Sequence, residues 1–264
     1  MEHGGGMTSD APPQDIPAPR AWSRAELALA GTLLLLATLS WWVTSTLAMP
    51  AMGLLTPMPM ESMPAAFFLI TWVVMMAAMM LPAITPFTVG VRRLVRARQP
   101  RRGTLAALTL GYLLLWSAAG VLAYAILRVF DTIMMSGAEV SVRAGGVVLL
   151  GAGLYQFTPL KRWCLTRCRS PLFLVVRHGE ALLRGRAGAL GVGVYHGAYC
   201  LGCCWALMLV QLALGAMSLV WMAVVAAVMT VEKALPRGEV TSHALGGVLV
   251  AAGMLLMIWP TLVL

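Results

Sequence analysis

Long apolar stretches separated by short polar segments run along most of this chain. One helix needs about 20 consecutive apolar residues to cross a membrane core of about 30 Å. Seven stretches reach or approach that length: 25–47, 65–90, 104–127, 143–160, 188–214, 216–231 and 243–263. The pattern predicts an all-α, polytopic membrane helix bundle of about seven transmembrane helices, or six if one of the two shortest stretches, the fourth or the sixth, does not cross.

The segments between the apolar stretches are too short to form a separate soluble domain. The first residues contain three consecutive glycines and four prolines before position 20, a composition that cannot bury a core. We therefore expect a disordered cytoplasmic tail over 1–24 and a single transmembrane helical domain over 25–264. The first apolar stretch is longer than the 7–15 residues of a signal-peptide core, which favours an uncleaved anchor over cleavage near Ala48.

The composition supports this prediction, because 60% of the residues are apolar and only 11% are charged. Soluble domains carry about 25% charged residues, so a water-soluble globule is excluded. In a soluble protein the net charge of +9 would suggest a nucleic-acid partner. In a membrane protein, an excess of basic residues is first explained by the orientation of the helices in the bilayer. The partner that we expect is therefore the lipid bilayer, with no nucleic acid.

The basic residues fix an expected orientation, because they fall almost entirely on alternate segments between the stretches. Of the 19 Lys and Arg residues, 17 lie on one side and only Arg128 and Arg143 on the other. Basic segments stay in the cytoplasm, so we expect a cytoplasmic amino terminus in a multi-pass protein of the inner (plasma) membrane. Seven crossings would then place Leu264 outside.

The chain is also rich in sulfur, with 19 methionines and 5 cysteines. The loop after the first stretch is expected outside the membrane and contains five methionines: Met49, Met52, Met58, Met60 and Met63. Thioethers are soft ligands that select Cu(I). The alternative is a loop that lies on the membrane surface and dips these side chains into lipid.

The second stretch carries Met75, Met76, Met79 and Met80. The pairs 75/79 and 76/80 are spaced i,i+4, so two adjacent thioether stripes run along one side of the predicted helix. Taken alone, such stripes are more often helix packing, because methionine fills irregular gaps. Their value as ligands depends on what faces them.

The fifth stretch carries the most informative pattern. His196, Cys200 and Cys204 form an i,i+4 ladder, which Met208 extends by one turn, and Cys203 is i+3 from Cys200. Thiolates and an imidazole on one helix face suit Cu(I) or Zn(II). The alternatives are cysteines that act as small apolar side chains and a histidine bonded to a neighbouring helix.

Two further cysteines lie in the predicted cytoplasmic segment. Cys164 and Cys168 are i,i+4 if the fourth helix continues past Pro159, and they would then share one metal. Nearby basic residues would lower the pKa of both thiols, unless these cations are only membrane anchors. Glu232 and Lys233 end the sixth stretch and are expected to pair with each other or with neighbouring helices.

Several of these segments together carry a family resemblance. They are Trp72 with 75–82, Tyr155-Gln156, 159–161, Cys164, Cys168, Arg169, Pro171, 199–205, Met208, Trp221-Met222 and Glu232-Lys233. Over roughly 65–260 the chain resembles a bacterial family of predicted metal-binding integral membrane proteins, described as copper-binding or copper-chaperone-like. The resemblance implies copper delivery to an exported enzyme and does not name that client. The tail, the first stretch and the methionine loop lie outside it.

The leading hypothesis is a metal-binding membrane protein that binds and delivers Cu(I), with zinc as the alternative metal. The relay would run from Cys164 and Cys168 through the ligands within the membrane to the outer methionines. Its client would be a copper-requiring exported or membrane enzyme. The chain itself is not expected to be an enzyme.

Two other functions stay open on the sequence. One is a membrane thiol–disulfide oxidoreductase that uses the Cys200-x-x-Cys203 pair, although the outer loops contain no cysteine for exchange with an exported substrate. The other is a structural partner in a membrane complex, which the glycine-rich helix faces would permit.

Overall fold

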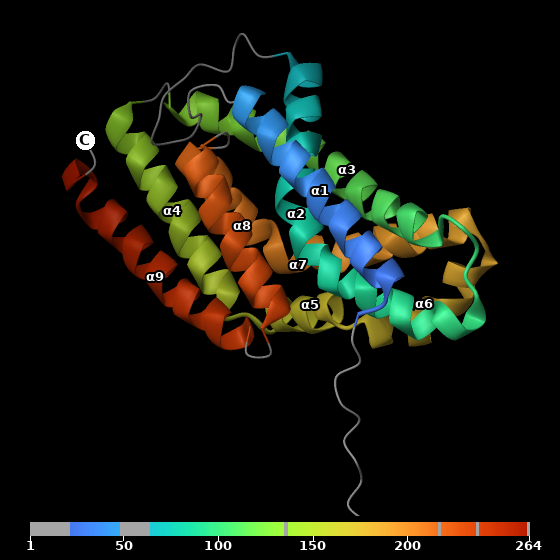
Figure 1. The fold of residues 1–264 in the computed structure, drawn as a ribbon. Helices are drawn as coiled ribbons and strands as arrows, with labels where there is room; N and C mark the ends of the chain where they lie inside the picture. Colours follow the sequence, from blue (N-terminus) through green and yellow to red (C-terminus); the bar gives the residue numbers. More distant parts are fainter. Residues whose placement is uncertain (1–21, 48–63, 135–136, 216–217, 236–237, 263–264) are drawn as a thin grey trace, which may run out of the picture.

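The computed structural model describes residues 22–47, 64–134, 137–215, 218–235 and 238–262. These ranges form nine α-helices and two short 3-10 helices and contain no strand: α1 Arg24–Leu47, α2 Ala65–Val95, η2 Arg96–Arg98, α3 Thr104–Met134, α4 Ala138–Gln156, α5 Pro159–Arg169, α6 Pro171–Arg184, α7 Arg186–Gly215, α8 Leu219–Ala234, α9 Gly238–Ile258 and η3 Pro260–Leu262 (Figure 1). The predicted all-α helix bundle is confirmed. The methionine loop and residues 1–21 of the expected tail lie outside the described residues.

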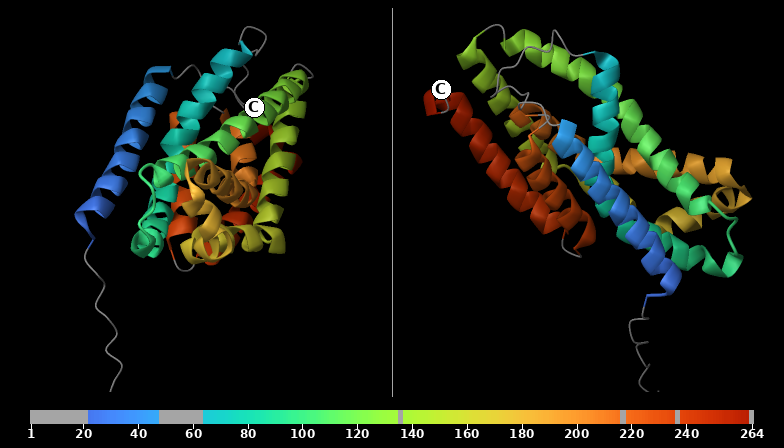
Figure 2. Two further views of the ribbon diagram at one scale, coloured as in Figure 1. Left: turned by 90° about the vertical axis from the view of Figure 1, so that its right-hand side faces the viewer. Right: turned by 45° about the horizontal axis from the view of Figure 1, so that its top comes forward.

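Six of the described helices are long and apolar enough to cross a membrane, namely α1, α2, α3, α4, α7 and α9. The protein is therefore a membrane protein with at least six candidate membrane-spanning helices among the described residues. The sixth predicted stretch corresponds to α8, which has 16 residues and falls short of the roughly 20 that a full crossing needs. The start of α1 and the end of α9 lie at opposite ends of the bundle (Figures 1 and 2).

The helices form two packed groups around the most buried pair, α2 and α7. On one side α4 packs along α9, and α8 lies beside them (Figure 1). On the other side α3 packs along α7, while α1 lies at the edge of the bundle against α2 (Figure 2). The helix α7 contacts α3, α4, α5, α6 and α8, so its side chains can meet those of five other helices.

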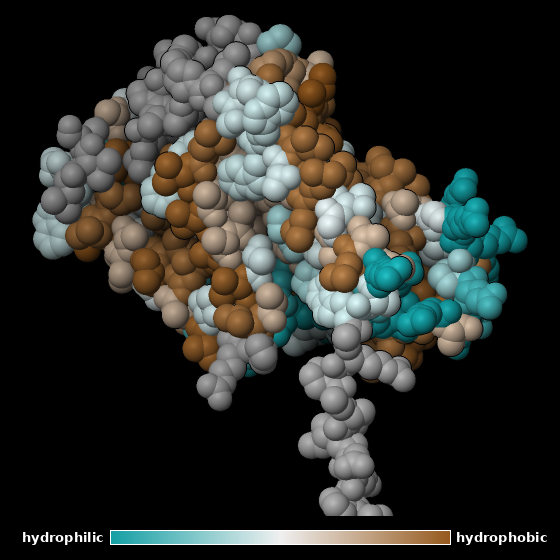
Figure 3. All heavy atoms as spheres, viewed as in Figure 1, coloured by the Kyte–Doolittle hydropathy of each residue, from teal (hydrophilic) through white to brown (hydrophobic). Residues whose placement is uncertain are grey.

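The outer surface is apolar over the helices and polar at one end. Large apolar side chains such as Leu122 and Val220 are exposed, as lipid-facing positions require. Hydrophilic side chains gather where the turn before α3 meets the α6–α7 junction (Figure 3), and Arg101, Arg102 and Arg186 lie together there. The arginine-rich segments thus meet at one end of the molecule.

The two short helices that follow α4, namely α5 and α6, begin at the same kind of capping signal. Thr158 Oγ1 accepts a hydrogen bond from the Lys161 backbone N–H (3.3 Å), and Ser170 Oγ accepts one from Phe173 N–H (3.1 Å). Each capping residue precedes a proline, which is favoured in the first turn of a helix because it lacks an N–H group. The fourth helix does not continue past Pro159: α4 ends at Gln156 and a new helix, α5, carries both Cys164 and Cys168 at the i,i+4 spacing.

A close approach of α3 and α7 fixes the position of the fifth predicted stretch. Gly193 faces the Leu108 carbonyl oxygen and Gly111 faces the Leu190 carbonyl oxygen, so a Cβ atom at either glycine would collide with backbone. Small residues at such crossings let helix backbones approach closely. The contact brings Tyr112 of α3 against the middle of α7.

Candidate metal centre

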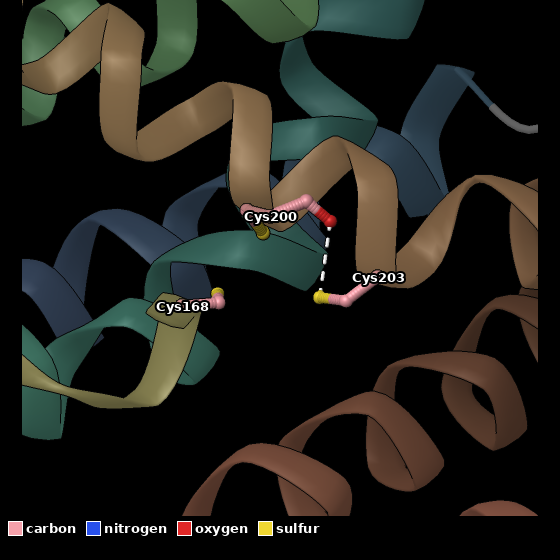
Figure 4. Close-up of side chains that lie close together, drawn as sticks. All are labelled: Cys168, Cys200 and Cys203. Atoms are coloured by element: carbon pink, nitrogen blue, oxygen red, sulfur yellow. Dashed lines mark hydrogen bonds between the residues drawn. The ribbon is translucent and has the colours of Figure 1, made fainter. Parts of the chain in front are cut away.

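Three cysteine thiols from two helices converge near the end of the bundle where α5 crosses α7. The ligand atoms of Cys168 on α5 and of Cys200 and Cys203 on α7 all lie within 4.8 Å of one another (Figure 4). Two sulfur atoms bound to one metal at about 2.3 Å can be at most about 4.6 Å apart, so small side-chain movements would bring these three sulfur atoms to one metal. All three side chains are buried and free of disulfides. We call Cys168, Cys200 and Cys203 the thiol cluster.

The spacing on α7 also places a fourth thiol beside this cluster. Cys204 Sγ lies 3.4 Å from Cys203 Sγ, and the Cys203 thiol donates to the Cys200 carbonyl oxygen (3.2 Å). Cys204 is as buried as the other α7 cysteines. A metal held by the cluster would have a further soft ligand within reach.

Two polar side chains that sequence reasoning did not assign to the site face Cys200. The Tyr112 hydroxyl lies 3.0 Å from Cys200 Sγ, and the Lys233 ammonium donates to the same sulfur at 3.1 Å. Lys233 Nζ also lies 3.8 Å from Met80 Sδ. The sequence contained a pattern that could have assigned Lys233 to a site, because it is an ionisable residue at the end of an apolar helix. A single tyrosine in an apolar stretch gives no comparable indication for Tyr112.

His196 lies one turn before Cys200 and is buried. Its ring stacks on Phe87 with 3.7 Å between centroids, and its Nδ1 has no hydrogen-bond partner among the described residues. A buried polar atom without a partner costs free energy. The imidazole therefore has a nitrogen available for a ligand, in a cavity that Cys168 and Cys200 also line.

The methionines of the second stretch are all buried on α2: Met75, Met76, Met79 and Met80. Of these, Met80 contacts Lys233, whose ammonium group also contacts Cys200 Sγ. Met208 lines a different, largely apolar cavity with Trp72 and Trp116, which shares no lining residue with the cavity at the cluster. The α7 ladder thus divides between two cavities.

The two cysteines of α5 have different surroundings. Cys168 belongs to the thiol cluster, whereas Cys164 packs against Gly202, where a Cβ atom would lie 2.6 Å from its sulfur. Burial raises the pKa of the Cys164 thiol more than Arg167 lowers it. The hydrogen bond with Cys200 is the largest cause that raises the pKa of Cys168. Basic neighbours do lower the pKa of each thiol, as expected, but the other causes outweigh them and both pKa values are raised.

A cavity of about 550 Å³ connects the thiol cluster with the surface. Its lining includes Thr166, which is exposed, and Cys200, which is buried. Arg169 and Lys233 line it as well, and none of its described lining residues is acidic. A small ligand can therefore reach the sulfur atoms from the end where α5 meets α6.

A second polar group lies directly beside the site. Lys161 Nζ lies 2.9 Å from Glu232 Oε2 and donates to the Gln156 side-chain oxygen, and Ser242 Oγ donates to Glu232 Oε1 (2.8 Å). We call Gln156, Lys161, Glu232 and Ser242 the ion-pair network; all four are buried. The expected pairing of Glu232 with a neighbouring helix is confirmed. Lys233, one residue later, faces the thiols instead.

A membrane helix bundle with buried free thiols and an access cavity defines the class of this molecule: a membrane protein equipped to hold a soft metal ion. The family model described as "PpoB2: Copper chaperone" matches residues 69–256, more than half of the chain. The chain therefore belongs to this copper chaperone family. No curated protein and no solved structure matches it.

Proposed function

We propose that this protein binds Cu(I) at the thiol cluster within the inner membrane and delivers it to a copper-requiring exported or membrane client protein. The observation that carries the proposal is the convergence of Cys168 with Cys200 and Cys203 from a different helix. Thiolates suit Cu(I) as well as Zn(II), and membership of the copper chaperone family supports copper between the two. Copper is here the cargo of the protein.

The other metal ligands predicted from the sequence fall into two groups: those that lie near the thiol cluster and those that rest on the sequence alone. His196 and Cys204 lie next to the cluster and are proposed as further ligands. Met80 is proposed as a neighbouring thioether. Cys164, Met75, Met76, Met79 and Met208 stay predictions from the sequence, as do the loop methionines, the cytoplasmic amino terminus and the outer carboxy terminus. Zinc would require four ligands, which Cys204 or His196 could complete.

The proposed role is non-enzymatic. A thiol–disulfide oxidoreductase that acts on proteins must present its cysteines to large substrates, but Cys200 and Cys203 are each only 1% exposed. Copper would move by exchange of one thiolate or thioether ligand for the next. Copper stays Cu(I) throughout, so this exchange requires no redox partner.

Metal analysis of the detergent-purified protein, loaded with Cu(I) under reducing conditions and desalted, tests the proposal. The wild type should retain stoichiometric copper, and Cys168→Ser and Cys200→Ser should lose it. Cys164→Ser replaces a buried cysteine of the same helix that lies outside the cluster. Retained copper in this variant would confine the site to the cluster, and lost copper would add Cys164 to the ligands. Unchanged copper in Cys200→Ser would refute the site, and zinc retained in preference to copper would refute the metal.

A further inference from the structure

The route to the thiol cluster has a charge of unexpected sign for a cation site. Of the described residues that line the cavity, Arg169 and Lys233 carry positive charge and none carries negative charge. Bare Cu(I) is a cation, so this entrance would repel it.

The cavity also limits the size of what enters. A volume of about 550 Å³ falls in the range that small-molecule sites occupy and is too small for a folded protein domain. Thr166 and Ser170, which carry hydroxyl groups, line it near Arg169. A small anionic ligand would therefore meet positive charge at Arg169 and again at Lys233, with the Ser170 hydroxyl beside Arg169.

We propose that Cu(I) reaches this cavity as an anionic complex with small-molecule thiolates, drawn in by Arg169 and Lys233 and transferred to the thiol cluster. This inference rests on the proposed function, because it names the form in which the cargo arrives at the same site. Lys233 contacts Cys200 Sγ and thus holds positive charge at the place where the carrier must release copper.

The transfer balances as a ligand exchange. One copper bis-thiolate, with one negative charge at its core, reacts with the three cysteine thiols of the cluster. Three copper–sulfur bonds to the protein form and two to the carrier break. Two of the cysteine protons go to the departing carrier thiolates and the third goes to water. The product is a copper tris-thiolate with two negative charges, two carrier molecules whose sulfur is protonated and whose other charges are unchanged, and one proton, and copper stays Cu(I).

Three carriers with the same donor atom and different charge test this inference: Cu(I) bis-thiolate complexes formed with excess 3-mercaptopropionate, 2-mercaptoethanol or cysteamine, whose net charges run from about −3 through about −1 to about +1 because the copper bis-thiolate core carries −1 and each carrier adds the charge of its own substituent. The protein is kept in a neutral detergent, and retained copper is measured after timed desalting. We expect the transfer rate to fall in that order. Electrostatic steering changes rates by about tenfold or more at low salt. Added salt should reduce the difference.

Matched variants assign the effect to the cavity. Arg169→Gln should bring the three rates together, and Arg169→Lys, which keeps the charge, should preserve their order. Lys233→Met is a second test if loss of the Arg169–Leu235 hydrogen bond unfolds Arg169→Gln. Arg184→Gln is the control, because Arg184 is exposed on α6, pairs with Glu180 and does not line the cavity.

The outcomes separate this inference from the proposed function. Equal rates from the three carriers, with stoichiometric copper at equilibrium, would overturn the inference and leave the copper site standing. A rate order that survives in both Arg169→Gln and Lys233→Met would also overturn it, because the charge that selects the carrier would then lie elsewhere. Failure to take copper from any carrier would overturn the proposed function and this inference together.

Discussion

Two polar regions meet at adjacent residues of α8, and they differ in how completely their charges are compensated. Glu232 faces the ion-pair network, where Lys161 and Ser242 satisfy both of its carboxylate oxygens. Lys233 faces the thiol cluster, where it contacts sulfur and lines an open cavity. Compensated buried charges fix the relation of helices to one another, whereas a cluster with spare ligands and an entrance is arranged to take up an ion.

The largest effect is expected when one charge of the ion-pair network is removed. Lys161→Met should lower the free energy of unfolding by about 3–5 kcal/mol, because it leaves the Glu232 carboxylate buried without a counter-ion. The double variant Lys161→Met/Glu232→Leu should recover most of this loss. Thermal unfolding of the metal-free protein in detergent measures both.

The control for this prediction is an exposed ion pair of similar type. Glu139→Gln removes the partner of Arg143 on α4, a surface pair at 2.6 Å. Exposed pairs contribute at most about 1 kcal/mol, so this variant should unfold at nearly the wild-type temperature. Equal losses from Lys161→Met and Glu139→Gln would show that the ion-pair network does not hold the helices.

Changes in the thiol cluster should act on a different quantity. Copper at 100 times its dissociation constant should stabilise the wild type by about 2.7 kcal/mol, because it binds only the folded protein. Cys200→Ser should abolish this increment while leaving the metal-free protein close to wild type. Unfolding curves with and without Cu(I) measure the increment. A full increment in Cys200→Ser would contradict the site.

Removal of the Lys233 charge should have a smaller effect on copper binding. The ammonium donates to Cys200 Sγ, and a hydrogen bond to a charged partner contributes about 1.5–3 kcal/mol. Lys233→Met should therefore weaken Cu(I) affinity by about tenfold or more, while Lys233→Arg should lose less. Competition with a Cu(I) chelator measures the affinity, and tighter binding in Lys233→Met would contradict this role.

The smallest expected effect distinguishes the two cysteines of α5. Gly202→Ala should destabilise the protein by about 1 kcal/mol, because the new Cβ atom would crowd Cys164 Sγ. Adding Cys164→Ala should relieve part of that loss. Gly191→Ala on the same helix is the control, since nothing lies within 4 Å of a Cβ atom there. Equal unfolding temperatures of the two alanine variants would contradict the packing role of Cys164.

Much of the fold could be predicted from periodicity, because the bilayer imposes a length and an apolar composition on every crossing helix. Hydropathy did not predict the break near Thr158, where a side-chain cap before Pro159 starts a new helix inside the predicted stretch 143–160. The cysteines and histidine of α7 could be predicted to share one site because their spacing puts them on one helix face.

The sequence by itself determined the bundle class, the placement of the arginines and the sulfur-bearing face of α7, because all three follow from local order along the chain. Only the tertiary structure decided that Cys168 rather than Cys164 joins that face, and that Lys233 faces sulfur while Glu232 pairs with Lys161. The reason is physical. Adjacent helical residues point about 100° apart, and which neighbour each one meets depends on how separate helices cross.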